Sequence, residues 1–291
     1  MRSIVLAAAA AACLVSFASA SPSPPDDAAA AKDVTESRKA FDSLKAEYDK
    51  AVKEFNDLYR AAKDDAGRQE ALAKRPKPEE WSPRFAAIAK EHAKDAAAAN
   101  CLAWIVQNDR TPRTQATALE ALLAGHLASP LIGNVCSSLQ YSQAANADAF
   151  LRAVLEKSAD RETQARACYT LAKVVSGRAD LASRMRSDPS LRGNVEQWYG
   201  KDYADTLAKV DVPALGKESE DLLERVVAKF GDVKWGRRTM AEQAKGDLNE
   251  IRNLTAGKVA PEVEGTDGDG KAFKLSDYRG KVVLLDFWGE W

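Results

Sequence analysis

The cysteines and histidines are the side chains with the clearest chemical potential, and their spacing limits what they can do. The four cysteines are Cys13, Cys101, Cys136 and Cys168. None of them forms a Cys-x-x-Cys pair, and with only His92 and His126 available the sequence offers no credible zinc site. The turn-rich run 265–270 holds two aspartates but lacks the further acidic ligands of a calcium loop. We therefore predict no metal site and no cofactor.

A second group of candidate residues lies at the C-terminal end of the sequence and contains Asp286, Trp288 and Trp291. The near-continuous apolar run 282–288 is typical of a parallel strand that is covered on both faces. It follows Ala-Pro, a predicted hairpin over residues 262–275, Leu-Ser-Asp-Tyr and Arg-Gly-Lys. This order, ending in Asp-Phe-Trp-x-x-Trp, resembles the redoxins of the thioredoxin superfamily. Those are exported thiol-disulfide oxidoreductases and the alkyl hydroperoxide reductase and thiol-specific antioxidant group.

The resemblance implies a site chemistry and a set of substrates. A Cys-x-x-Cys pair would follow Trp291 at a helix N-terminus, where the helix dipole and free amides lower the pKa of the first thiol. Asp286 matches the buried acid that accepts a proton from the resolving cysteine, and Trp288 and Trp291 match the aromatic wall beside the disulfide. The alternative is that Asp286 is only a hydrogen-bonded strand carboxylate and that the tryptophans pack in the core. The implied substrates are protein thiols and disulfides, or peroxide.

Because the cysteine pair is missing, we expect the chain to be truncated just before the catalytic motif and to be inactive as written. A selenocysteine-x-x-Cys motif encoded by UGA, a nonsense mutation and a sequence error would all give this sequence. The expected thioredoxin-like fragment covers residues 258–291.

The remainder of the chain is predicted to be helical over residues 33–254. Apolar residues from Phe41 to Ala62 recur at steps of three and four, which indicates one long helix. Docking of this helix on a neighbour is favoured over a coiled-coil dimer. A second helix is expected to start at Ser82-Pro83. The periodicity of this second helix continues through residues 85–107, and further predicted helices cover residues 113–127, 130–141, 147–157, 161–175, 218–230 and 239–254. The last two resemble a tetratricopeptide hairpin, so the fold class is mainly α, either an irregular helical bundle or stacked hairpins.

Charge and the N-terminus indicate where the protein works. The 42 basic and 43 acidic residues nearly balance, which gives no electrostatic reason to expect nucleic-acid binding. Residues 1–20 have the charged, apolar and small-residue regions of a signal peptide, and residues 21–32 are predicted to be a disordered leader. We expect an exported, periplasmic or secreted protein, with membrane attachment only if Cys13 carries a lipid.

Removal of the signal would leave three cysteines in an oxidising compartment. We interpret Cys101, Cys136 and Cys168 as small apolar residues on helix faces, with one disulfide among them as the alternative and a reactive thiol as a third option. For the whole chain, the alternative to an oxidoreductase is a non-catalytic helical scaffold that binds a protein partner.

Overall fold

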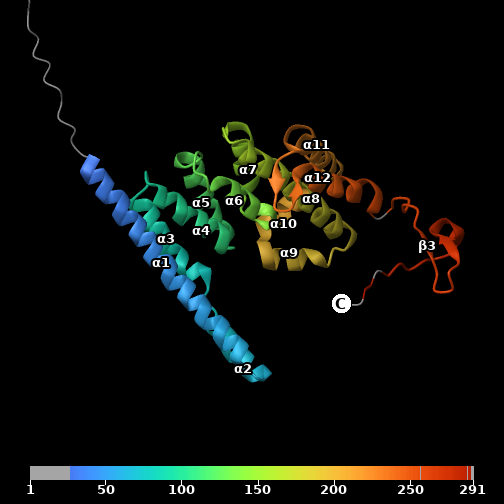
Figure 1. The fold of residues 1–291 in the computed structure, drawn as a ribbon, viewed down its shortest axis with the longest axis horizontal. Coiled ribbons are helices and arrows are strands. Elements are labelled where there is room, and N and C mark those ends of the chain that lie inside the picture. Colours follow the sequence, from blue (N-terminus) through green and yellow to red (C-terminus); the bar gives the residue numbers. More distant parts are fainter. Residues whose placement is uncertain (1–26, 256, 287, 290–291) are drawn as a thin grey trace, which may run out of the picture.

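The computed structural model describes residues 27–255, 257–286 and 288–289. The expected signal peptide, residues 21–26 of the expected leader and Trp291 lie outside the described residues. Helices run through most of the described chain, and the strands form two small antiparallel hairpins, which confirms the mainly α fold (Figure 1). The helices are α1 (Asp27–Ala61), α2 (Asp65–Ala73), α3 (Pro78–Glu91), α4 (Ala96–Asn108), α5 (Pro112–Gly125), α6 (Ile132–Ser138), α7 (Ala147–Lys157), α8 (Arg161–Ser187), α9 (Leu191–Tyr199), α10 (Lys201–Lys209), α11 (Val212–Phe230) and α12 (Met240–Asn249). A 3-10 turn, η1 (Leu139–Tyr141), follows α6, and a π-helical turn, η2 (Glu250–Leu254), follows α12.

The long helix α1 forms one side of the molecule, and α3 and α4 pack on its first half (Figure 1). Phe41 and Leu44 are buried, and the Tyr48 ring stands edge-on to both Trp81 and Trp104 at centroid distances of 5.4 and 4.9 Å. This contact confirms that the predicted stripe docks on neighbouring helices. The helix starts at Asp27, so the last part of the expected leader is helical.

Several helix starts follow from capping residues that the sequence displays. The Asp160 carboxylate accepts a hydrogen bond from the Thr163 amide at 2.8 Å at the start of α8. Thr239 and Glu242 form a reciprocal capping box at the start of α12. Both starts are where the sequence predicts them.

The predicted helix over residues 85–107 is wrong, because the structure breaks it into α3 and α4. Asp95 has extended backbone angles and stands at the N-cap of α4. The predicted start at Ser82-Pro83 is also wrong, since α3 begins at Pro78 and contains Pro83. The Ser82 hydroxyl donates to the Pro78 carbonyl at 3.1 Å, so it bonds back along the helix instead of capping it.

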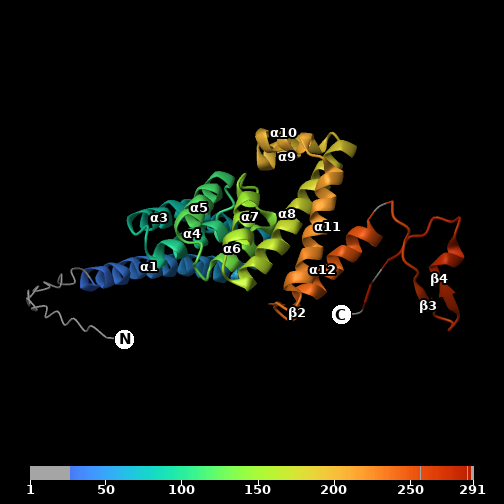
Figure 2. The same cartoon turned by 90° about the horizontal axis from the view of Figure 1, so that it is seen from above.

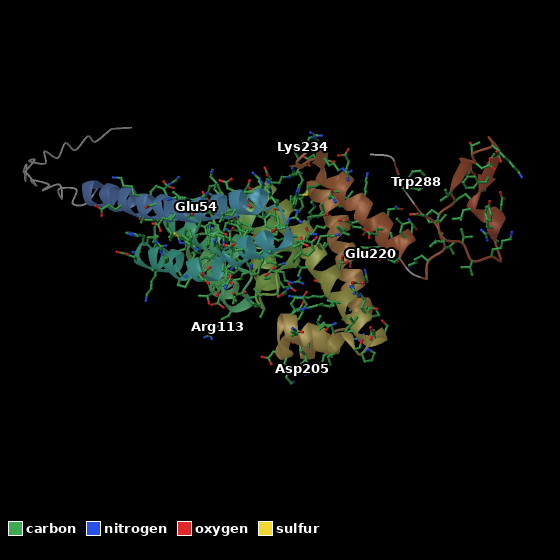
Figure 3. The ribbon with its side chains drawn as sticks, turned by 90° about the horizontal axis from the view of Figure 1, so that it is seen from below. Glu54, Arg113, Asp205, Glu220, Lys234 and Trp288 are labelled. Atoms are coloured by element: carbon green, nitrogen blue, oxygen red, sulfur yellow. The ribbon has the colours of Figure 1, made fainter. Side chains whose placement is uncertain are left out.

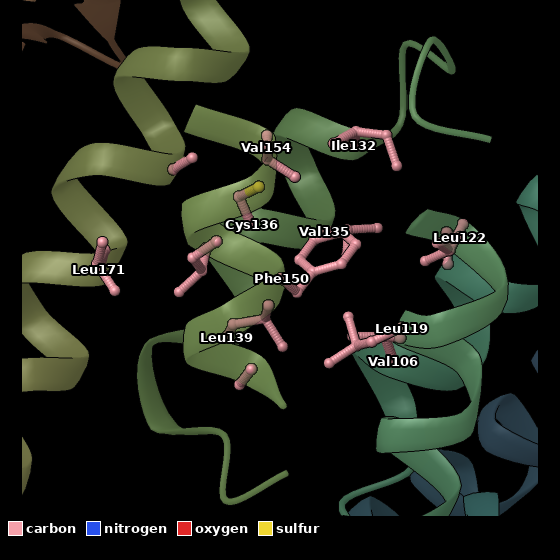
Figure 4. Packing of buried hydrophobic residues seen from close by; sticks show 14 of the residues in the cluster. Val106, Leu119, Leu122, Ile132, Val135, Cys136, Leu139, Phe150, Val154 and Leu171 are labelled. Carbon is pink, nitrogen blue, oxygen red and sulfur yellow. The ribbon is translucent and has the colours of Figure 1, made fainter. Parts of the chain in front are cut away.

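The main core runs through the middle of the row of helices, where α6 and α7 pack on α8 (Figure 4). Phe150, Leu139 and Leu171 are almost fully buried there. Helix α8 continues past the predicted end at Val175, because Ala182 and Met185 enter a second, smaller core with α9 and α10. The pair α11 and α12 packs on the other side of α8 (Figure 2).

The C-terminal segment stands apart from the helices and carries the second β-hairpin (Figure 2). Strand β3 (Glu264–Thr266) pairs with β4 (Ala272–Lys274), with Gly265 opposite Phe273. This confirms the hairpin that the turn-rich run predicts. The first hairpin, β1 (Lys234–Trp235) with β2 (Arg238–Thr239), only connects α11 to α12.

Candidate functional site

The C-terminal hairpin is held by carboxylates that bond to backbone amides. Asp267 accepts from the amides of Asp269 and Lys271 at 3.1 and 2.8 Å, so this carboxylate closes the turn between β3 and β4. Asp277 accepts from the Lys274 amide at 3.0 Å at the start of the 3-10 turn η3 (Leu275–Tyr278). Glu262 accepts from the Ser276 amide at 3.0 Å, which ties the entry of the hairpin to η3.

The apolar run after η3 does not form the predicted strand among its described residues. Residues 282–286 have no regular secondary structure, and the side chains of Val282 and Leu284 are 103% and 93% exposed. A strand with two apolar faces needs a partner strand on each side and a layer over each face. Within the part of the C-terminal segment that the structure describes, the strands are the three-residue β3 and β4, which pair with each other.

The predicted site residues are therefore not brought together. Asp286 is exposed to solvent and not buried. Trp288 is 80% exposed; it follows the C-terminal hairpin in the sequence and lies between this hairpin and the helices in Figure 3. Trp291 lies outside the described residues. Among the described residues, Asp286 is not a buried acid and Trp288 is not packed in an aromatic wall, because no apolar layer covers residues 282–286.

The three cysteines of the helical region are buried and free, so the alternative of a disulfide among them is wrong. Burial raises the pKa of the Cys101 and Cys136 thiols to about 12 and that of Cys168 to about 11. A thiol is nucleophilic only as the thiolate, so these groups are unreactive near neutral pH. This agrees with their interpretation as small apolar core residues.

The sequence analysis missed a buried polar network between α8 and α12. The Tyr169 hydroxyl donates to Asp247 at 2.7 Å, and the Lys173 ammonium donates to the same carboxylate at 3.1 Å. Trp235 lies edge-on to the Tyr169 ring, and Arg166 lies over the face of Trp235. The available signal was a carboxylate on the otherwise apolar inner face of α12, which buries Met240, Ala244 and Leu248. The network joins α8 to α12 through two hydrogen bonds to one carboxylate, and we interpret it as structural.

Other features of the described part of the chain bear on binding. A cleft of about 740 Å³ lies between the α5–α6 and α7–α8 loops, with Lys157 and Arg166 on its wall. The Arg166 guanidinium is already bonded to Glu162 and Asn134. Among the described residues, no three histidine, cysteine or acidic side chains gather as a metal site would require. No helix in the same residues is long and apolar enough to cross a bilayer.

Comparisons with known proteins support one class of protein, the thioredoxin-like oxidoreductases. The chain is 40% identical over 47 residues to the thiol-disulfide oxidoreductase ResA of Bacillus cereus, a match that covers 16% of this chain and 27% of that protein. It is 50% identical over 44 residues to ResA of Geobacillus kaustophilus, covering 15% and 25% of the two chains. The chain thus spans about a quarter of the length of these curated relatives. No protein-family model matches the chain, and no solved structure matches it with significance.

Proposed function

We propose that residues 258–291 begin a thioredoxin-like domain of an exported thiol-disulfide oxidoreductase, and that residues 33–254 form a helical domain attached in front of it. The local similarity to ResA carries the proposal. The β3–β4 hairpin followed by η3 and the apolar run supports it, because these elements come in the order that the redoxin motif requires. Thiol-disulfide exchange is favoured over peroxide reduction, since the matched relatives are thiol-disulfide oxidoreductases by name.

The proposed site needs a covered strand and a dithiol that these 291 residues do not contain. When partner strands flank residues 282–286, Asp286 would be desolvated and able to accept a proton from the resolving cysteine. Trp288 and Trp291 would then pack beside the disulfide. We propose that the cysteine pair, or its selenocysteine form, is encoded in frame after Trp291, and DNA sequencing tests this directly.

The 291-residue chain itself is proposed to be inactive in thiol chemistry. It has no Cys-x-x-Cys pair, and the thiols of its helical domain are buried with raised pKa values. An insulin-reduction assay of this chain is expected to show no turnover above the uncatalysed rate. Measurable turnover would contradict the proposal.

A chimera provides the positive test. Residues 258–291 replace the matching segment of Bacillus cereus ResA, up to the position where the redoxin motif places the cysteine pair. The chimera is expected to fold and to reduce insulin, because the graft supplies the hairpin and the strand of the same domain. Failure of the chimera to fold, while the equivalent graft from Geobacillus kaustophilus ResA does fold, would refute the assignment of residues 258–291.

The same chimera tests the role of Asp286. Asp286→Asn is expected to slow turnover by about tenfold or more without unfolding the chimera, because general acid-base catalysis contributes roughly a factor of 100 or more. Asp269→Asn is the matched control, since Asp269 lies exposed in the hairpin turn and only its amide is bonded. Equal turnover of the two variants would remove Asp286 from the site.

A non-catalytic scaffold is the second candidate, and one observation favours it. Within the described residues, the buried core is built from positions 41–248 and contains no side chain of the C-terminal segment. The helical domain is therefore expected to fold without residues 255–291 and to melt cooperatively by circular dichroism. An inactive, unfolded chimera together with a stable helical domain would favour the scaffold.

A further inference from the structure

A groove lined by tyrosines lies between η1, α8 and the α9–α10 pair, and neither proposed function uses it. Two adjoining clefts, of about 160 and 300 Å³, share Tyr141 and Gln143 as lining residues. Tyr199 and Tyr203 form the far wall, at a ring-centroid distance of 5.4 Å, and Arg110 lies at the other end. The groove thus runs from an aromatic wall to a cation.

Of the tyrosines that line the groove, Tyr199 and Tyr203 are half-buried against the second core, whereas Tyr141 is largely exposed. Tyr141 is 77% exposed. Beside the groove lining, Trp198 stands edge-on to Tyr199 and is 62% exposed. Large amphipathic rings of this kind supply contact area at a low cost in side-chain entropy when a ligand covers them. Neighbouring exposed rings with polar tips are the lining that proline-rich segments use, because the polyproline II helix presents flat rings and unpaired carbonyls.

The polar groups of the groove add a preference for negative charge. Arg110 makes no ion pair among the described residues, and its contact with the Ser138 carbonyl is long, at 3.5 Å. Arg178 lies on the groove wall and is paired with Asp148 at 2.8 Å. An acidic group of a ligand at this end of the groove could therefore form an ion pair with Arg110.

The chain itself contains a segment with this chemistry, Ser-Pro-Ser-Pro-Pro-Asp-Asp at positions 21–27. We propose that the tyrosine groove binds this segment of a second copy of the chain, with the prolines on the tyrosine rings and the aspartates near Arg110. The proposal goes beyond the proposed oxidoreductase function and does not depend on it.

The segment cannot reach the groove of its own copy. Its residues 21–26 precede α1, which begins at Asp27 and is a 35-residue helix about 52 Å long at 1.5 Å per residue. Figure 2 shows the Asp27 end of α1 at one end of the molecule, away from α9 and α10. Six residues in polyproline II conformation extend only about 19 Å. A second copy must therefore supply the segment.

Gly177 provides a way to block the groove without disturbing the fold. It lines the groove from within α8, and a Cβ atom at this position would meet no atom within 4 Å. Gly177→Leu should fill the space that the peptide needs. Gly246→Leu is the matched control, because Gly246 is also helical, exposed and free of neighbours within 4 Å, but lies on α12.

The test measures binding of a fluorescein-labelled peptide of residues 21–27 to the chain beginning at Asp27, by fluorescence anisotropy. Saturable binding is expected, with the dissociation constant raised at least tenfold by Gly177→Leu and Arg110→Glu and unchanged by Gly246→Leu. A peptide with alanine in place of its prolines should bind at least tenfold more weakly. Absence of saturable binding, equal binding of the alanine peptide, or no effect of Gly177→Leu would each overturn the proposal.

Discussion

Removal of the Tyr169 hydroxyl is expected to destabilise the packing of α12 on α8. The hydroxyl donates to Asp247 at 2.7 Å, and the two residues are only 6% and 9% exposed. A hydrogen bond to a charged group contributes about 1.5–3 kcal/mol, and burial prevents water from replacing this one. Tyr169→Phe leaves the carboxylate with Lys173 as its remaining partner. We therefore expect a loss of about 2 kcal/mol in the free energy of unfolding.

Asp247→Ala removes the shared acceptor and should cost more. It leaves the buried Tyr169 hydroxyl without its acceptor, whereas the Lys173 side chain is 28% exposed and can turn to water. Breaking a fully buried charged pair costs about 3–5 kcal/mol, so the partial exposure of the lysine places the expected loss near 3 kcal/mol. We therefore expect Asp247→Ala to lower the free energy of unfolding more than Tyr169→Phe does.

Urea unfolding followed by tryptophan fluorescence and far-ultraviolet circular dichroism measures both losses. The matched control is Tyr141→Phe, because the Tyr141 hydroxyl is on the surface and the ring is 77% exposed. This control should change the free energy of unfolding by less than about 0.5 kcal/mol. If Tyr169→Phe and Tyr141→Phe have the same effect, the network contributes nothing and the reasoning fails.

Three further predictions concern thiols, pH and the C-terminal segment. The thiols of Cys101, Cys136 and Cys168 should resist Ellman's reagent at pH 8 in the folded protein and react fully in urea, because burial raises their pKa values; fast reaction of the folded protein would contradict the burial. Burial followed by the bond to Asp247 raises the pKa of Tyr169, so the neutral phenol is favoured in the folded state. The stability that the neutral phenol contributes is complete below pH 10 and is lost as the pH rises above 10. Unfolding measured at alkaline pH should therefore show a smaller decline in the free energy of unfolding for Tyr169→Phe than for the wild type. Trp288→Ala should leave the unfolding midpoint unchanged, since the side chain is 80% exposed, and a clear shift in a thermal melt would show a contact that the structure lacks.

Local signals in the sequence predicted the elements that depend on local physics. Asp160 and Thr239 predict the starts of their helices. A side-chain oxygen at this position accepts a hydrogen bond from a free amide of the first turn, and this does not depend on where the helix packs. The hairpin of β3 and β4 likewise depends on the turn residues between its strands. The break at Asp95 was missed because both α3 and α4 bury apolar residues at helical spacing, so the pattern continues across the break.

Features that depend on distant partners could not be predicted in the same way. Tyr169 and Asp247 are 78 positions apart, and nothing in either local pattern pairs them. The apolar composition of residues 282–285 predicts that a strand there would need a neighbouring strand on each side. It does not predict whether those neighbouring strands are present. Asp286 is exposed in this structure, and its role as the buried acid stays a prediction because its burial depends on those neighbours.

The deep placement of the helical thiols has a consequence for any redox chemistry carried out nearby. A dithiol centre exchanges with whatever sulfur its nucleophile can approach, including sulfur on its own polypeptide. Cys136 and Cys168 are fully buried between packed helices, and burial raises the pKa of both thiols well above neutral pH. The buried cysteines of the helical domain are therefore not expected to exchange with a dithiol centre nearby while the domain is folded.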